Sequence, residues 1–91
     1  MSEKSIKIEK PSTEKLESMN IKTWSIWTKE PPTFDWHYDD NETCYLLDGD
    51  VTVKTSEGEV SFGKGDLVMF PKGLDCTWQI KKAVKKHYKF G

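Results

Sequence analysis

Arginine is absent from this sequence, and all fourteen basic residues are lysines. The guanidinium group of arginine binds phosphates and guanine edges through paired hydrogen bonds, so its absence argues against a nucleic-acid partner. No segment approaches the roughly 20 consecutive apolar residues of a transmembrane helix, and we expect no membrane partner. The N-terminal segment is too polar for a signal peptide, and we therefore expect a cytoplasmic protein.

Cysteine and aliphatic residues are also scarce. Cys44 and Cys76 are the two cysteines, and in a cytosolic chain we expect reduced thiols rather than a disulfide. Apolar residues make up only 35% of the chain, but four Trp, four Phe and three Tyr supply large surfaces for burial. A length of 91 residues suits one domain, residues 1–91, with an N-terminal extension at 1–22 and a barrel from about 23 to 91.

Acidic and basic residues are separated along the chain. Residues 30–59 contain nine acidic residues and one lysine, whereas residues 72–91 contain six lysines and one aspartate. The lysine-rich C-terminal segment, which includes His87, reads as a solvated edge strand whose lysines discourage pairing with other chains.

Helical patterns are almost absent. Residues 13–19 form one short helical pattern, which Ser12 or Thr13 can cap and Asn20 can end. The remaining chain reads as about eight short strands separated by turn signals every 8–12 residues, a pattern typical of a β-sandwich or barrel. Asp48-Gly49 predicts a tight hairpin, and residues 56–58 predict a second one.

Two spaced motifs favour one kind of barrel. Glu42 precedes the turn residue Gly49 by seven positions, and Gly65 precedes Pro71 by six. This pair resembles the two cupin motifs, His-x-His-x3–4-Glu-x6-Gly and Gly-x5-Pro-x4-His-x3-Asn. The resemblance implies an all-β fold, a double-stranded β-helix or jelly-roll barrel of RmlC-like type with a site at its mouth and, here, a short N-terminal helical turn.

Further segments are similar to the small cupins of the ureidoglycine aminohydrolase cupin-domain family. They are an aromatic segment at 24–27, a Phe-x-Trp-x-Tyr stretch at 34–38, a Glu-x-Cys-Tyr stretch at 42–45 and a Phe-Pro-x-Gly stretch at 70–73. This resemblance implies a small-molecule hydrolase or isomerase assisted by a divalent transition metal (Mn, Fe, Zn or Ni).

The metal ligands that the resemblance implies, three histidines and one glutamate, are mostly replaced. Only Glu42 is retained, and the third histidine corresponds to Cys76. The first two histidines fall on Trp36 and Tyr38 or, with the longer spacer, on Asp35 and His37.

Side chains alternate along a strand, so two registers are open at residues 35–38. The aromatic alternation favours the first register. In it, the residues expected to bind substrate inside the barrel are Trp36, Tyr38, Glu42, Cys76 and Trp78. These side chains offer few suitable donor atoms for a divalent cation. An aromatic cage with a carboxylate suits a small polar-aromatic or cationic ligand. In the second, Asp35 and His37 point inward, and His37 joins Glu42 and Cys76 as metal-ligand candidates.

Glu42 and Cys76 are the candidate catalytic residues. A carboxylate inside an aromatic cavity suits general acid–base chemistry, and a thiol can serve as a ligand or a nucleophile. We expect both to line one cavity, and we expect Glu42→Gln to leave the fold intact. We expect the protein to bind a small polar molecule in the barrel, as a metal-assisted hydrolase or isomerase would. The alternative is a module without metal, which either binds a small molecule without catalysis or serves as a dimeric structural unit.

The strand at residues 23–28 suggests an assembly. Trp24 and Ile26 share one face and Trp27 points to the other, so one face needs additional cover. We expect a homodimer with Trp24 or Trp27 near its interface. A monomer in which residues 1–10 cover this strand is the alternative.

Overall fold

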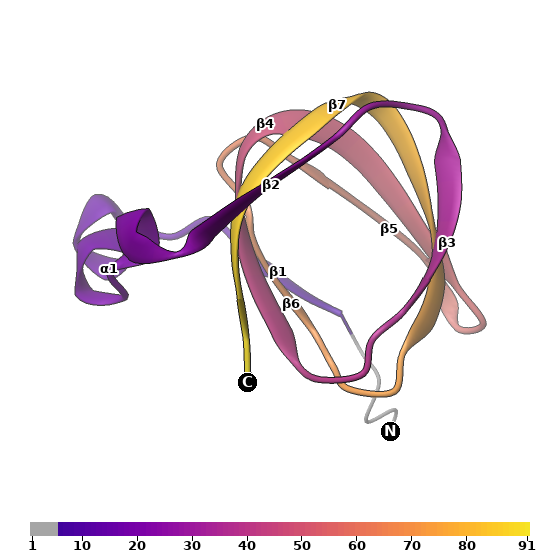
Figure 1. Ribbon diagram of the computed structural model, residues 1–91, viewed down its shortest axis with the longest axis horizontal. Helices are drawn as coiled ribbons and strands as arrows, with labels where there is room; N and C mark the ends of the chain where they lie inside the picture. Colours follow the sequence, from indigo (N-terminus) through magenta and orange to yellow (C-terminus); the bar gives the residue numbers. More distant parts are fainter. Residues whose placement is uncertain (1–5) are drawn as a thin grey trace.

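The computed structural model describes residues 6–91, which form a barrel of seven antiparallel strands with one α-helix and one turn of 3₁₀-helix (Figure 1). The strands are β1 (Lys7–Glu9), β2 (Ser25–Lys29), β3 (Thr33–His37), β4 (Glu42–Thr55), β5 (Gly58–Gly63), β6 (Leu67–Phe70) and β7 (Asp75–Phe90). The helices are α1 (Thr13–Ser18) and η1 (Ile21–Thr23). The predicted all-β jelly-roll barrel is confirmed.

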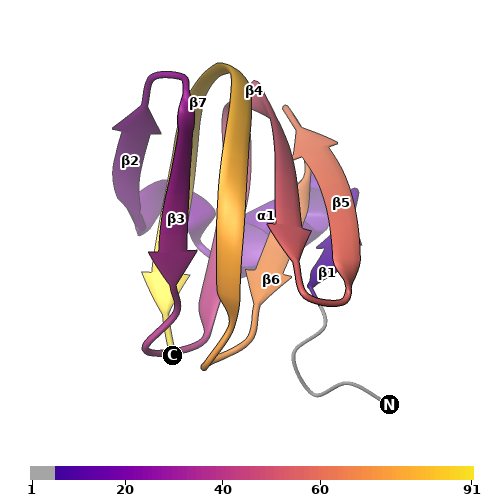
Figure 2. The ribbon, with the colours of Figure 1, turned by 90° about the vertical axis from the view of Figure 1, so that its right-hand side faces the viewer.

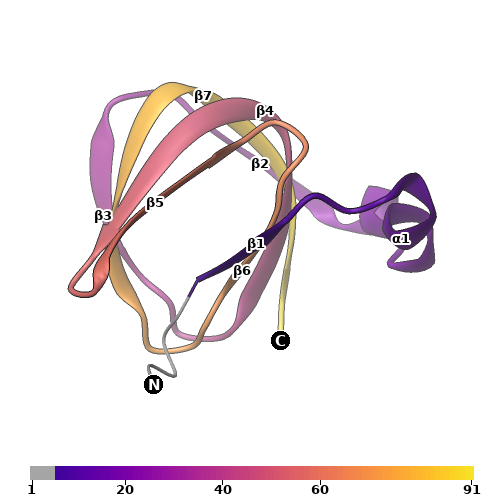
Figure 3. The same ribbon diagram turned by 180° about the vertical axis from the view of Figure 1, so that it is seen from behind.

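Two long, curved strands, β4 and β7, run through both halves of the barrel and pair with each other along most of their lengths. The first part of β4 also pairs with β6, and β6 pairs with β1 on its other side. The last part of β7 pairs with β2. The second part of β4 pairs with β5, and the first part of β7 pairs with β3. Figure 2 shows β3, β7, β4 and β5 side by side, and Figure 3 shows β1 beside β6.

The tight hairpin predicted at Asp48-Gly49 is wrong, because both residues lie within the continuous strand β4. The pairing of β4 with β7 shifts register between Leu46 and Asp48 and again on either side of Asp50, so the strand bends at bulges instead of reversing. Gly49 has a φ of 126°, and a Cβ there would lie 3.1 Å from the Val84 Cα atom. The predicted second hairpin is confirmed, with Thr55 opposite Gly58.

The solvated edge strand predicted for the lysine-rich C-terminus is also wrong. β7 is a central strand, paired with β4 on one side and with β2 and β3 on the other. Its side chains therefore alternate between the barrel interior and the outer face, and Lys86 and His87 are both buried. His87 Nδ1 donates to the carbonyl oxygen of Trp24 at 3.1 Å, in the segment that leads from η1 into β2.

The core fills the barrel interior with aromatic rings that pack against one another and against aliphatic side chains. Trp78 is 1% exposed and packs against neighbouring rings that include Phe62, Phe70 and Trp27. Tyr38 stacks on Phe70 with ring centroids 4.7 Å apart. These rings supply the buried surface that the low content of aliphatic residues does not.

The N-terminal segment joins the sheet through β1, at the edge opposite β2. β1 pairs with β6, so the described part of residues 1–10 does not cover β2, and residues 1–5 lie outside the described part of the chain. The predicted helix forms at Thr13–Ser18, and the Ser12 hydroxyl accepts a hydrogen bond from the Lys15 amide. α1 stands outside the barrel wall (Figures 1 and 3). Neither helix of residues 6–91 is long and apolar enough to cross a membrane.

Candidate functional site

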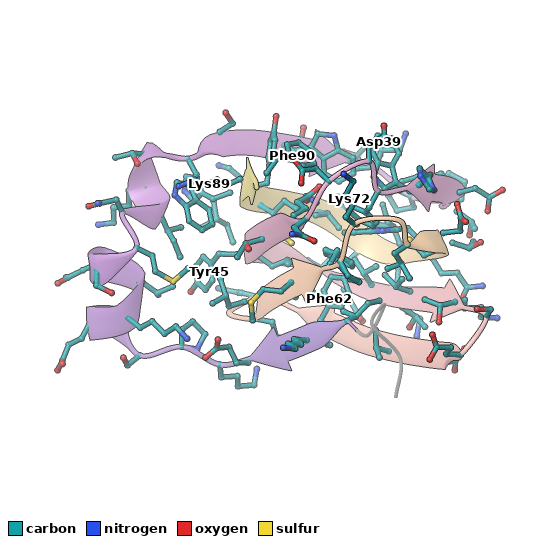
Figure 4. All side chains as sticks on the ribbon, turned by 90° about the horizontal axis from the view of Figure 1, so that it is seen from below. Asp39, Tyr45, Phe62, Lys72, Lys89 and Phe90 are labelled. Atoms are coloured by element: carbon teal, nitrogen blue, oxygen red, sulfur yellow. The ribbon has the colours of Figure 1, made fainter. Side chains whose placement is uncertain are left out.

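A cavity of about 270 Å³ is lined by residues of β2, β3, β4 and β7 and by Tyr38, which directly follows β3. Its wall is almost entirely aromatic, with one acidic and one basic side chain, and consists of Trp27, Phe34, Trp36, Tyr38, Glu42, Trp78, Lys86, Tyr88 and Phe90. Trp36 and Phe90 are about half exposed, at 47% and 48%, and form the rim. The loops that carry Asp39 and Lys72 lie together at one end of the barrel, where the Lys72 amide donates to Asn41 (Figure 4).

β3 adopts the register in which its aromatic residues face the cavity. Phe34, Trp36 and Tyr38 all line it, and Tyr38 is only 1% exposed. His37 points outward, where its Nδ1 atom lies 2.6 Å from Asp75. Asp35 is exposed as well and accepts a hydrogen bond from the Thr77 hydroxyl. The choice between the two registers left open by the sequence is thereby made in favour of the aromatic one.

Glu42 and Lys86 form a buried ion pair at the cavity wall. The Lys86 ammonium donates to Glu42 Oε2 at 2.6 Å, and both side chains are about 95% buried. The ammonium also lies 4.8 Å from the Trp27 ring centroid and 4.7 Å from that of Trp78. Two ring faces and one carboxylate therefore hold this charge in a site with little access to water.

Sequence reasoning missed Lys86 as a site residue. The signal that could have revealed it is the alternation of Val84, Lys86 and Tyr88, which puts the lysine on the same face as two apolar residues. That signal is informative only when both faces of the strand are known to be covered. Reading the segment as an edge strand concealed it.

Two further polar groups lie near this pair. Burial, and next the charge of Glu42, raise the pKa of the Tyr38 phenol far above its ordinary value, so the hydroxyl stays protonated. The Trp78 indole Nε1 atom is buried and makes no hydrogen bond within the described part of the chain. The indole N–H lowers the pKa of the Tyr38 hydroxyl and of the Cys76 thiol, against the larger effect of burial, but it is not in hydrogen-bonding geometry with either group.

Cys76 is not part of this cavity, contrary to the expectation that it lines one cavity with Glu42. It is buried among core residues and borders a separate open depression together with His37 and Asp75. Its thiol donates to the Trp36 carbonyl oxygen at 3.7 Å, and burial raises its pKa to about 11. A thiol with that pKa carries almost no thiolate near neutral pH, which does not suit a nucleophile. Cys44 is fully buried, with a pKa raised to about 12.

The metal-ligand candidates do not come together. Glu42 is engaged by Lys86, Cys76 borders the other depression, and His37 lies on the outer face beside Asp75. Among residues 6–91, no three His, Cys, Asp or Glu side chains are grouped so that they could hold a metal ion. The donor set therefore does not fit the divalent transition metal that the cupin resemblance implies.

Comparison with known proteins agrees with this fold. A DUF861 family protein from Thermotoga maritima is 51% identical, with 96% of this chain and 100% of that one covered, and its structure superposes with a TM-score of 0.93. The EutQ protein of Clostridium difficile is 21% identical and gives a TM-score of 0.64. The match covers 94% of this chain and 67% of the EutQ chain.

A more distant neighbour is a mutant of the oxalate decarboxylase of Bacillus subtilis, at 17% identity and a TM-score of 0.55, with 99% of this chain and 26% of that chain covered. At such identities, this enzyme and EutQ share the fold alone with the present protein. No protein of curated function gives a significant match. The EutQ-like cupin domain family matches residues 16–88. This protein is therefore a member of the EutQ-like cupin domain family.

Proposed function

We propose that this cupin binds a small, flat organic molecule in the aromatic cavity and holds the polar group of that molecule with Glu42 and Lys86 instead of a metal ion. The observation that carries the proposal is the buried Glu42–Lys86 pair at the wall of an open cavity of about 270 Å³. A buried ion pair is a weak source of stability compared with apolar side chains of similar volume, so its position at a cavity supports a role in recognition. The volume, near the lower end of the roughly 300–1,000 Å³ of typical ligand pockets, suits a single-ring molecule.

The arrangement of the aromatic rings supports a flat ligand. Phe34 stacks on Trp78 with an interplanar angle of 23°, while Trp27 and Trp36 meet their neighbours nearly edge-on. Such walls offer both ring faces and ring edges to a planar molecule. The half-exposed rim at Trp36 and Phe90 gives such a molecule a route into the cavity.

The metal-assisted hydrolase or isomerase suggested by the resemblance to the ureidoglycine aminohydrolase family is supported less well. Its metal would need ligands at positions that Trp36, Tyr38 and Cys76 occupy here. If this cupin catalyses a reaction, Glu42 and Lys86 are the acid–base pair that could move a proton within the cavity.

The proposal can be tested with the four tryptophans as reporters. Indole N–H signals of ¹⁵N-labelled protein are assigned with Trp→Phe variants and followed during titration with three planar probes, benzoate, benzamide and benzamidine. Binding of at least one probe is expected to shift the signals of Trp27, Trp36 and Trp78, which line the cavity, but not that of Trp24, which does not. No shift with any probe, or equal shifts of all four signals, would contradict the proposal.

A further inference from the structure

The cavity already contains the cation that its aromatic cage would otherwise accept. The Lys86 ammonium lies within 5 Å of the ring centroids of Trp27 and Trp78, at the place where a ligand cation would gain most from ring faces. The carboxylate of Glu42 is bound to the same ammonium at 2.6 Å. A cationic ligand would therefore meet a like charge and find the one acidic side chain of the cavity already neutralised.

Hydrogen-bond donors remain available in the same place. An ammonium has three N–H groups, and Glu42 is the hydrogen-bond acceptor that the described residues supply to Lys86. The rings of Trp27 and Trp78 lie beside the same nitrogen, and aromatic rings are weak acceptors. The Tyr38 phenol, which lines the cavity, stays protonated and can donate too.

On the basis of the proposed function, we propose that the ligand is a planar molecule that presents a carbonyl or carboxylate oxygen to Lys86. In this arrangement the lysine ammonium takes the part that a metal cation would take in a cupin with a complete ligand set. It supplies a fixed positive charge, which Glu42 and two tryptophan rings hold in place, and it donates a hydrogen bond to an oxygen atom of the ligand. An oxygen atom that replaces a ring face as partner of an N–H group forms a stronger, charge-assisted hydrogen bond.

The experiment compares three probes that share one shape and number of non-hydrogen atoms, with affinities taken from calorimetry or tryptophan fluorescence. Benzoate and benzamide both carry an oxygen acceptor, whereas benzamidine is a cation without one. Both oxygen-bearing probes are expected to bind at least about tenfold more tightly than benzamidine, the effect of one charge-assisted hydrogen bond worth about 1.4 kcal/mol. The ratio of benzoate to benzamide affinity shows whether the preferred oxygen belongs to an anion or to a neutral group.

Variants separate the role of Lys86 from general changes in charge. Because Lys86→Met alone leaves the Glu42 carboxylate without its partner, the test variant is the double substitution Glu42→Gln, Lys86→Met, and its matched control is Lys85→Met on the exposed face of β7. The double variant is expected to bind benzoate at least about tenfold more weakly, while the control binds as the wild type does.

Three results would overturn the inference. They are binding of benzamidine as tight as that of the oxygen-bearing probes, an unchanged benzoate affinity in a double variant shown to be folded by its NMR spectrum, and an equal loss in the Lys85→Met control. In each of these cases the proposed binding cavity itself would stand. Failure of all three probes to bind the wild type would remove the proposed function and this inference together.

Discussion

At the scale of single residues, the Glu42–Lys86 pair changes what a substitution at Glu42 should do. An unpaired carboxylate in an aromatic cavity would gain from neutralisation, which is why the sequence suggests that Glu42→Gln leaves the fold intact. In the structure the carboxylate is the partner of a buried ammonium, 6% exposed. Removal of either partner therefore leaves a charge or a strong donor buried without its counterpart.

We accordingly predict strong coupling between the two positions. Glu42→Gln and Lys86→Met should each destabilise the protein, Lys86→Met by about 3–5 kcal/mol, because it leaves a buried carboxylate unpaired. The double variant should be more stable than the Lys86→Met variant. Urea unfolding of the four proteins measures the coupling energy. Additive effects of the two substitutions would contradict a direct interaction between these side chains.

Cys44 provides a pH-dependent test of burial. Its pKa rises from 9.0 to about 12 in the folded protein, chiefly through desolvation. The folded state therefore holds the thiol proton more tightly than the unfolded state does. The resulting stability is fully present below about pH 9 and is lost as the pH rises towards 12.

The measurement compares the wild type with Cys44→Ala by urea unfolding at pH 8, 9, 10 and 11. Because the variant lacks this thiol, the stability advantage of the wild type should shrink above pH 9, while the titration of lysines affects both proteins alike. A constant difference across this pH range would indicate that Cys44 has an unshifted pKa.

At the scale of secondary-structure elements, the bend in β4 depends on Gly49. A side chain there would be strained by the φ of 126° and would also press against the Val84 backbone at 3.1 Å. Gly58, with the same φ of 126°, has nothing within 4 Å of the position of a Cβ atom. Substitution of Gly58 therefore tests backbone strain alone, whereas substitution of Gly49 tests strain together with the close contact to Val84.

We predict that Gly58→Ala costs about 1–2 kcal/mol, the strain of a left-handed conformation, and that Gly49→Ala costs clearly more. Thermal or urea unfolding of both variants checks this order. Equal losses would show that the approach of β4 to β7 at Gly49 is loose enough to accept a methyl group.

Prediction from sequence succeeded where a local pattern has one structural meaning. The alternation of Phe34, Trp36 and Tyr38 identified the inward face of β3, and the Glu42 motif identified a buried carboxylate. It failed at Asp48-Gly49, because the same dipeptide suits a hairpin turn and a bulge inside a continuous strand. The hairpin pattern is local, whereas the bend is decided by the distant strand β7.

Lys86 was missed for a related reason. A lysine in a strand is usually exposed, and only its partners from distant segments, Glu42 and the rings of Trp27 and Trp78, make its burial favourable. Cys76 is the opposite case. The motif placed it correctly in the barrel, but its thiol is buried in the core against the Trp36 carbonyl and does not line the cavity.

At the scale of the whole molecule, the homodimer remains a prediction. The structure turns Trp27 into the cavity and leaves Ile26 52% exposed on the outer face of β2, a strand at the edge of the sheet. If a second copy covers this face, Ile26→Glu should convert a dimer into a monomer without unfolding it. Light scattering of both proteins measures this. A wild-type mass near 10.6 kDa at every concentration would rule out the dimer.

We propose that an ion pair, Glu42 with Lys86, takes the role of the metal ion that the cupin motifs imply. The most direct measurement is metal content, by elemental analysis of the protein after dialysis against Mn²⁺, Fe²⁺, Zn²⁺ or Ni²⁺ and then against metal-free buffer, alongside Glu42→Gln. We predict far less than one metal ion per chain and no difference between the two proteins. One tightly held transition metal per wild-type chain, lost in Glu42→Gln, would contradict the claim.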